Sequence, residues 1–188
     1  MGKVLAIILK TVVKRKKNVN DLLVLGIPRG GVIVADVIVE KLNADYFDIV
    51  IPRKLRAPDN KENAIGAISQ DGSMMYLDEF MVSSLKVTAE YIEEEKTEQL
   101  AEVKRRIALY RPPPTTSNES STDYYPITAG KTIVLLIDDG IATGATVIAA
   151  TRWLRAKYQK PPAQLIIAAP VASKQAVELL RKEAVADM

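Results

Sequence analysis

At 188 residues, with 48% hydrophobic and 26% charged side chains, the chain has the size and composition of one globular domain with a substantial core. This composition excludes a chain that is disordered over its whole length. It contains no cysteine and no histidine, which excludes a disulfide framework, thiolate and Ser-His-Asp catalysis, and every His-ligated metal site. The net charge of +3 is compatible with an anionic ligand, but with aromatic residues at only 5% there is no base-stacking platform, and nucleic acid is not an expected partner.

The N-terminal segment predicts an amphipathic helix over residues 3–17, because apolar side chains recur there at helical spacing. Four cations at residues 14–17 could form a localisation or RNA patch. A solvated last helical turn is favoured, because cations there complement the helix dipole. The apolar run over residues 4–9 is too short for a spanning helix or a signal peptide, so we expect a cytoplasmic protein with no membrane contact.

A strand is expected over residues 22–25, followed by the Gly-rich turn GIPRGG at residues 26–31 and a helix over residues 32–42. This order places free N–H groups at the carboxyl edge of a sheet, where anions bind. A dinucleotide-binding turn is the alternative, but it is weak because the G-x-G-x-x-G spacing is absent. Arg29 is the charged candidate in this turn; otherwise it is a surface residue.

The next strand is expected over residues 48–51 and is followed by three cations, Arg53, Lys54 and Arg56. Just past a strand end, these side chains would bring positive charge to the same edge of the sheet. Residues 56–63 combine a proline with polar and charged residues, which predicts a mobile surface loop.

The middle of the chain predicts a hairpin over residues 65–69 and 74–77 and then a long helix over residues 83–110. Glutamates spread around that helix, which favours a solvated face over a metal cluster. These are Glu90, Glu93, Glu94, Glu95 and Glu98. Residues 111–122 hold three prolines and a Ser/Thr-rich run, and they are expected to form an irregular loop that returns the chain to the sheet. The alternative is that this loop extends a rim near the site.

Residues 133–137 are a continuous apolar run that predicts a strand buried on both faces of a parallel sheet. Asp138 and Asp139 follow where this strand surfaces. The loop over residues 140–146 offers glycines and threonine hydroxyls and leads into a helix from about Ala145. The pattern indicates a phosphate cradle beside two acids suited to sugar hydroxyls or a metal ion, whereas the simpler alternative makes the acids loop and capping residues.

The last elements are a strand over residues 164–169, ended by Pro170, and a helix over residues 174–183 capped by Ser173. Repeated units of strand and helix, with Gly-bearing loops at strand ends, predict a Rossmann-like parallel sheet flanked by helices. We expect one domain over residues 1–188, with its core at about residues 20–188.

The segment IVLLIDDGIATGAT, residues 133–146, resembles the 5-phosphoribosyl-1-pyrophosphate (PRPP) motif of type I phosphoribosyltransferases, in which hydrophobic residues precede two acids, a Gly and a T-G-x-T loop. GIPRGGV, IPRKLRAP and NAIGAISQDG closely resemble a group of uncharacterised predicted phosphoribosyltransferases. The resemblance runs from residue 22 onward and implies the type I phosphoribosyltransferase fold. That family has a further strand and a C-terminal stretch in the hood over the acceptor base, so a small or incomplete hood is expected here.

The resemblance also implies roles for individual residues. The PRPP 5-phosphate would be bound by Gly140, Ala142, Thr143, Gly144, Ala145 and Thr146. Its pyrophosphate would be bound by Ile27, Pro28, Arg29, Gly30 and Gly31. The expected catalytic residues are Asp138 and Asp139, which hold the ribose hydroxyls, and Arg29, Arg53 and Lys54, which neutralise the leaving group. The expected cofactor is Mg²⁺, bound mainly through PRPP with the two acids nearby, and the loop at residues 56–63 would close over the substrates.

The implied activity is that of a glycosyltransferase of nucleotide metabolism, which joins the ribose 5-phosphate of PRPP to a small nitrogenous base and releases pyrophosphate. Homodimers are usual in this family. The alternative is a regulatory protein of the same fold that senses PRPP or a nucleotide without turnover and binds nucleic acid. The intact acid pair and the cation-rich segments favour the enzyme.

Overall fold

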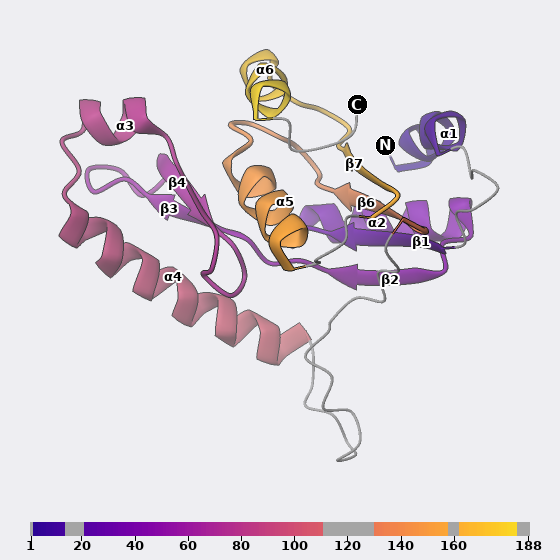
Figure 1. Ribbon diagram of the computed structural model, residues 1–188, viewed down its shortest axis with the longest axis horizontal. Coiled ribbons are helices and arrows are strands. Elements are labelled where there is room, and N and C mark those ends of the chain that lie inside the picture. The colour runs from indigo at the N-terminus through magenta and orange to yellow at the C-terminus, as the bar shows by residue number, and fades with distance from the viewer. Residues whose placement is uncertain (1, 14–20, 111–129, 158–161, 184–188) are drawn as a thin grey trace. The chain divides into compact units, whose positions relative to one another are not determined.

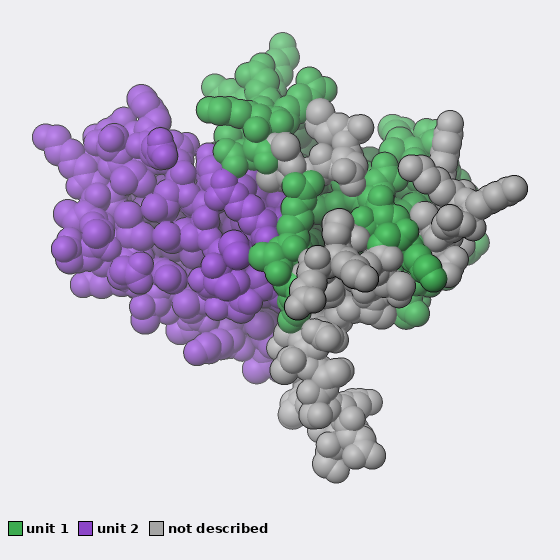
Figure 2. All heavy atoms as spheres, in the orientation of Figure 1, with its two compact units in different colours: residues 1–50, 123–144, 154–188 green, residues 51–122, 145–153 purple. Residues whose placement is uncertain are grey.

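The computed structural model describes residues 2–13, 21–110, 130–157 and 162–183. The chain divides into two compact units, shown in different colours in Figure 2. Unit 1 comprises residues 1–50, 123–144 and 154–188, and unit 2 comprises residues 51–122 and 145–153. The single domain expected over residues 1–188 stays a prediction, and the two units are described in turn.

Unit 1 is built on a four-stranded parallel sheet in the order β2-β1-β6-β7 (Figure 1). Its strands are β1 (Asp21–Gly26), β2 (Tyr46–Ile49), β6 (Thr132–Ile137) and β7 (Gln164–Ala168). Every residue of β6 is buried, as expected for an apolar strand in the interior of a parallel sheet. The predicted parallel α/β fold is therefore confirmed, although β2 begins and ends two residues before the strand expected over residues 48–51.

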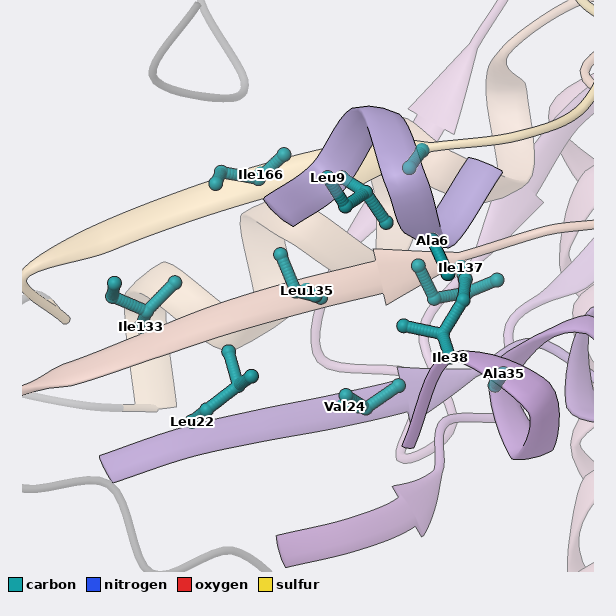
Figure 3. Close-up of a cluster of buried hydrophobic side chains, with 11 residues drawn as sticks. Ala6, Leu9, Leu22, Val24, Ala35, Ile38, Ile133, Leu135, Ile137 and Ile166 are labelled. Atoms are coloured by element: carbon teal, nitrogen blue, oxygen red, sulfur yellow. The ribbon is translucent and has the colours of Figure 1, made fainter. Parts of the chain in front are cut away.

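The helices of unit 1 are α1 (Gly2–Val12), α2 (Gly30–Leu42) and α6 (Lys174–Lys182). Side chains of α1 and α2 meet the sheet in one hydrophobic cluster, drawn in Figure 3. The cluster consists of Ala6, Leu9, Leu22, Val24, Ala35, Ile38, Ile133, Leu135, Ile137, Ile166 and Ala168. Its alternate β6 positions share one face because side chains along a strand have a period of two. Helix α1 ends at Val12, short of the expected residue 17, and residues 14–17 lie outside the described part of the chain.

Unit 2 contains a three-stranded antiparallel sheet in the order β3-β4-β5. Its strands are β3 (Arg53–Arg56), β4 (Ala64–Ile68) and β5 (Met75–Leu77), so the predicted hairpin is confirmed. The helices that follow are α3 (Glu79–Ser84) and α4 (Ala89–Tyr110). Helix α5 (Ala145–Lys157) contributes residues 145–153 to this unit and its last residues to unit 1.

Three expectations about unit 2 were wrong in detail. The single helix expected over residues 83–110 is instead divided between two helices. Lys86 adopts a left-handed φ of 50°, which interrupts the helix. The Thr88 hydroxyl then accepts a hydrogen bond from the Tyr91 N–H at 3.2 Å and caps the start of α4. Arg56 belongs to strand β3 and not to the loop that follows. Glu95 is buried and not on a solvated face, because it pairs with Arg56.

The irregular loop expected over residues 111–122 lies outside the described residues. Among the helices that the structure does describe, none combines the length and the apolar character that crossing a membrane requires.

Candidate functional site

Two loops of unit 1 leave the sheet at the same edge. Strands β1 and β6 are parallel neighbours, and Gly26 at the end of β1 is in register with Ile137 at the end of β6. The N–H of Ile27 donates a hydrogen bond to the Ile137 carbonyl at 2.9 Å, so the first residue after β1 is fixed to the last residue of β6. The carboxyl edge of a parallel sheet is the usual position of ligands in such folds. The structure thus brings residues 27–31 and residues 138–144 together, as the expected site requires.

Residues 27–31 form a compact turn that opens helix α2. Ile27 is buried, and the peptide bond between Pro28 and Arg29 is cis. Arg29 is exposed at the N-cap of α2, and its guanidinium has no hydrogen-bond or ion-pair partner among the described residues. Gly30 and Gly31 are the first residues of the helix, where backbone N–H groups have no partner within the helix. An exposed cation beside free N–H groups suits an anion.

The two acids take different positions at the end of β6. The backbone N–H of Asp138 donates to the Ala168 carbonyl at 3.1 Å, which continues the pairing of β6 with β7. The backbone N–H of Asp139 donates to Oδ1 of Asp138 at 2.9 Å. The Asp139 carboxylate is exposed and lies against Gly30, so closely that a Cβ atom added to Gly30 would be 2.8 Å from the Cβ of Asp139. A side chain at residue 30 would therefore force this turn and the Asp139 side chain apart.

The loop over residues 140–144 is held by a neighbouring segment of unit 1. Ile141 donates its N–H to the Val171 carbonyl at 3.0 Å and accepts from the Ser173 N–H at 2.9 Å. The Ser173 hydroxyl donates to the Ala142 carbonyl at 2.6 Å. These bonds fix the shape of the loop, while Ala142 and the Thr143 side chain stay exposed. Gly144 has a φ of 84°, in the left-handed region, and so turns the chain into helix α5.

Ser173 is a supporting residue whose second role the sequence did not reveal. The sequence predicted it as the cap of the last helix, and its Oγ indeed accepts from the Ala176 N–H at 2.9 Å. Its bond to Ala142 joins segments separated by 31 residues. No local pattern encodes such a pairing, so only the fold could show it.

Arg53 and Lys54, the other expected cations, belong to strand β3 of unit 2, whereas both loops belong to unit 1. The Nε and Nη2 atoms of Arg53 donate to Oε1 of Gln99 at 3.0 and 2.8 Å. Burial and, to a smaller extent, the positive charge of neighbouring Arg106 lower the pKa of Arg53. Lys54 is exposed and has no partner within the described ranges. The structure therefore places Arg53 and Lys54 on strand β3 of unit 2, and their role toward a ligand stays a prediction.

The donors of the site fit a Mg²⁺ ion that is held mostly by a ligand. The described residues contain no group of three or more acidic or histidine side chains that could hold a metal. They do contain the adjacent carboxylates of Asp138 and Asp139 at a strand end. Mg²⁺ is commonly bound by one or two carboxylates together with the phosphate oxygens of a substrate. The residues present match that mode better than a cage made by the protein alone.

Comparison with known proteins points the same way. Two Mycobacterium tuberculosis proteins, from different strains and each named "Putative phosphoribosyl transferase", are 38% identical to this chain over 133 residues. The match covers 71% of this chain but only 27% of either relative, so the chain spans about a quarter of their length. The crystal structure of TT1426 from Thermus thermophilus is similar with a TM-score of 0.61 and 32% sequence identity, over 96% of this chain and 76% of that one.

The match to a protein family covers almost the whole sequence. It spans residues 2–186, and the family is described as the phosphoribosyl transferase domain. The turn at residues 27–31 and the segment at residues 138–144, which contains the acid pair, lie within the matched residues. Together with the parallel α/β sheet, this match assigns the family, and the chain belongs to the phosphoribosyl transferase domain family.

Proposed function

We propose that this chain is a phosphoribosyltransferase that takes PRPP as its donor, joins the ribose 5-phosphate to a nitrogenous base, and releases pyrophosphate with the help of Mg²⁺. The observation that carries the proposal is the pairing of two loops at one sheet edge: residues 27–31, which open helix α2, and residues 138–144, which lead into α5. PRPP has a phosphate at one end and a pyrophosphate at the other. Two separate loops at one sheet edge, the second of which begins with two carboxylates, match that distribution of charge.

In the proposed reaction, the bond between the ribose C1 and the pyrophosphate oxygen breaks and C1 forms a bond to a nitrogen of the base. The electron pair of the broken bond leaves with the pyrophosphate, and the base gives up a proton to solvent or to the leaving group. Negative charge therefore grows on the pyrophosphate. The N–H groups at the start of α2 and the exposed Arg29 guanidinium would stabilise that charge.

The second loop would hold the other end of the donor. The backbone N–H groups near Gly144 and the hydroxyls of Thr143 and Thr146 are suited to the 5-phosphate, and Asp138 and Asp139 can accept hydrogen bonds from the ribose hydroxyls. When bound, Mg²⁺ would supply positive charge to the pyrophosphate oxygens. No residue of the chain needs to act as a covalent nucleophile, so catalysis would rest on positioning and electrostatics.

The remaining parts of the proposal come from the family resemblance. Arg53 and Lys54 are proposed to add positive charge for the leaving group, and residues 56–63 to close over the substrates. A homodimer that works in the cytoplasm is also proposed. The exposed ammonium of Lys54, without a partner among the residues described, is compatible with a role toward a ligand.

The test is pyrophosphate release from PRPP and Mg²⁺ across a panel of purine, pyrimidine and other nitrogenous bases. Release that depends on one class of base would support the enzyme and identify its acceptor. The double variant Asp138→Asn, Asp139→Asn should lose PRPP binding while its far-UV circular dichroism spectrum stays that of the unmodified protein. Unchanged affinity for PRPP in this variant would contradict the assignment of the site.

A second outcome would favour the regulatory alternative. If PRPP binds tightly and no base gives turnover, the protein would be a sensor that kept the donor site. Nucleic-acid binding should then be measured as a function of salt, because contacts to phosphates weaken steeply as the salt concentration rises. If PRPP does not bind at all, both the enzyme and the PRPP sensor are excluded.

A further inference from the structure

Helix α1 is apolar around most of its circumference, but the fold covers only one side of it. Ala6 and Leu9 point toward the sheet and are buried in the hydrophobic cluster (Figure 3). The opposite side carries four large apolar side chains that are 45% to 66% exposed: Val4, Ile7, Ile8 and Val12. No other described element has more than two exposed large hydrophobic side chains. Since a helix that is apolar all round is normally buried all round, the outer side of α1 is expected to have a partner.

The four exposed side chains form one stripe along the helix. Residues 4, 8 and 12 are four positions apart and residues 4 and 7 are three apart, so they lie on successive turns of one face. Thr11 is the polar residue within this stripe, and its hydroxyl donates to the Ile8 carbonyl at 2.7 Å. A hydroxyl that is already bonded within the helix can enter an apolar environment at little cost. The whole stripe is therefore suited to leave water.

The charged residues of α1 are both cations. Lys3 and Lys10 are exposed, and because they are seven residues apart they lie on the same flank of the stripe, two turns from each other. The first 20 residues contain no acid, and the sequence after α1 continues with further cations at residues 14–17. An apolar stripe bordered by cations complements a membrane that contains anionic lipids.

We propose that the outer side of α1 binds the surface of a membrane with anionic lipids. Val4, Ile7 and Ile8 would enter the boundary between headgroups and acyl chains, and the two lysines would contact lipid phosphates. The helix would lie on the membrane and not cross it, since its 11 residues are too few to span a bilayer. The expectation of no membrane contact rested on that length, which argues only against a spanning segment. The inference is independent of the proposed activity, because α1 contributes no residue to the two loops of the candidate site.

The charges favour a membrane over two other partners. If a second copy packed its α1 antiparallel on this stripe about a twofold axis, Lys3 of one copy would lie beside Lys10 of the other. Helix α1 has no acid that could pair with these lysines in any orientation. A nucleic acid would attract the lysines but leave the apolar stripe in water. A layer of anionic headgroups over acyl chains satisfies both the lysines and the stripe.

The test is co-sedimentation of the full chain with large unilamellar vesicles. One set is pure phosphatidylcholine, and the other contains about one-third phosphatidylserine. The protein should bind the phosphatidylserine vesicles about tenfold or more tightly than the neutral ones. Binding should weaken as the salt concentration rises from about 0.1 M to about 0.5 M, because salt screens the lysines. Equal binding to both sets, or binding to neither, would overturn the proposal.

Two double variants separate the apolar contribution from the electrostatic one. Ile7→Ser with Ile8→Ser removes apolar surface without changing the charge, and it should weaken binding about tenfold or more. Lys3→Gln with Lys10→Gln removes two cations and should weaken binding by a similar factor. If the serine variant binds phosphatidylserine vesicles as tightly as the unmodified protein, the stripe does not enter the membrane.

Matched controls come from other elements. Phe80→Ser removes a side chain on α3 that is 77% exposed. Lys104→Gln with Lys182→Gln removes two exposed cations, on α4 and α6. Both controls should bind as the unmodified protein does, within about twofold. If they weaken binding as much as the α1 variants, the vesicles attract only the general positive charge of the protein, and the assignment to α1 is wrong.

A fluorescent label tests the contact without removing the stripe. The chain contains no cysteine, so Val4→Cys can carry a single environment-sensitive fluorophore, with Phe80→Cys as the matched control. Phosphatidylserine vesicles should shift the emission of the label at residue 4 to shorter wavelength and leave that at residue 80 unchanged. A label at residue 4 that stays in water while the protein sediments with vesicles would overturn the contact.

The other partners give different results. If the protein forms a dimer that Ile7→Ser with Ile8→Ser dissociates, and does not bind vesicles, the stripe is an interface between copies and the proposal is wrong. If it binds RNA through Lys3 and Lys10 and does not bind vesicles, the proposal is equally wrong. The release of pyrophosphate from PRPP tests the proposed function separately, so either proposal can fail while the other stands.

Discussion

Arg56 and Glu95 join strand β3 to helix α4 through both backbone and side chain. The guanidinium donates from Nε to Oε1 at 2.7 Å and from Nη2 to Oε2 at 2.9 Å, and the backbone N–H of Arg56 donates to Oε1 at 3.0 Å. The Glu95 side chain is only 4% exposed. Burial alone would raise the pKa of Glu95, but the hydrogen bonds from Arg56 outweigh it and lower that pKa below its usual value.

Glu95→Ala should therefore be strongly destabilising. It removes the acceptor of the Arg56 bonds and of a bond from Gln99 Nε2, and it leaves the Arg56 cation without its buried partner. Breaking a buried pair from one side costs about 3–5 kcal/mol in the free energy of unfolding, and the lower end is expected here because Arg56 keeps its ion pair with the exposed Glu98 at 2.6 Å. The change in the free energy of unfolding is measured by urea unfolding, with circular dichroism as the signal. Glu94→Ala, at an exposed position on the same helix, should change stability by less than about 0.5 kcal/mol; equal effects of the two variants would contradict this view of Glu95.

Asp71 should make the stability of unit 2 depend on pH. Burial would raise its pKa, but bonds from the Ser73 hydroxyl at 2.7 Å, the Ser73 N–H at 3.0 Å and the Trp153 Nε1 at 2.6 Å lower it from the usual 3.8. A carboxyl group whose pKa is lower when folded stabilises the protein above its unfolded pKa, and that stability is lost as the pH falls through the folded value.

The measurement is urea unfolding at pH 6, 4 and 3 of the unmodified protein and of Asp71→Asn. The unmodified protein should be the more stable at pH 6, and the difference should shrink as the pH falls below about 4. Asp59→Asn, at an exposed position in the same unit, is the matched control. A difference that stays constant or grows on acidification would show that Asp71 is not held as a carboxylate.

Ser173 should couple the stability of α6 to the order of the loop before α5. Ser173→Ala removes the helix cap, at a cost of about 1 kcal/mol in the free energy of unfolding, and also the bond to the Ala142 carbonyl. Amide hydrogen exchange within residues 140–144 should become faster. Ser173→Thr keeps the hydroxyl and should preserve both properties. Faster exchange confined to α6 would show that the bond to Ala142 does not support the loop.

Thr143→Val combined with Thr146→Val should weaken the binding of ribose 5-phosphate. Each valine keeps the shape of threonine but removes a hydroxyl donor, and a hydrogen bond to a charged group contributes about 1.5–3 kcal/mol, or about tenfold or more in affinity. Titration calorimetry with ribose 5-phosphate measures the loss. Thr11→Val, an exposed threonine on α1, is the control. If the double variant weakens only pyrophosphate binding, the two loops have been assigned in reverse.

Much of unit 1 could be predicted because its signals are local. The apolar run that became β6 and the acids after it lie within one short segment, and so do the Gly-rich turn and the apolar start of α2. Ser173 was recognised as a cap from its position before an amphipathic run. Such features depend on side chains a few residues apart, and these positions share a strand, a turn or a helix in any fold.

The errors arose where long-range contacts overrule a local pattern. Glutamates that surround a helix predict a solvated face, yet Glu95 is buried because Arg56 reaches it from a strand 39 residues earlier in the chain. The break between α3 and α4 was hidden because the flanking residues favour helix, and only the left-handed Lys86 and the Thr88 cap reveal it.

The sequence by itself determined the parallel α/β class, the two Gly-bearing loops at strand ends and the acid pair, because each is encoded by neighbouring residues. Only the tertiary structure decided which atoms of those segments meet. The contact of the Asp139 carboxylate with Gly30 and the support of Ala142 by Ser173 both join segments that are distant in the chain. Their pairing follows from the registers of β1 with β6 and of β6 with β7, which no local pattern specifies.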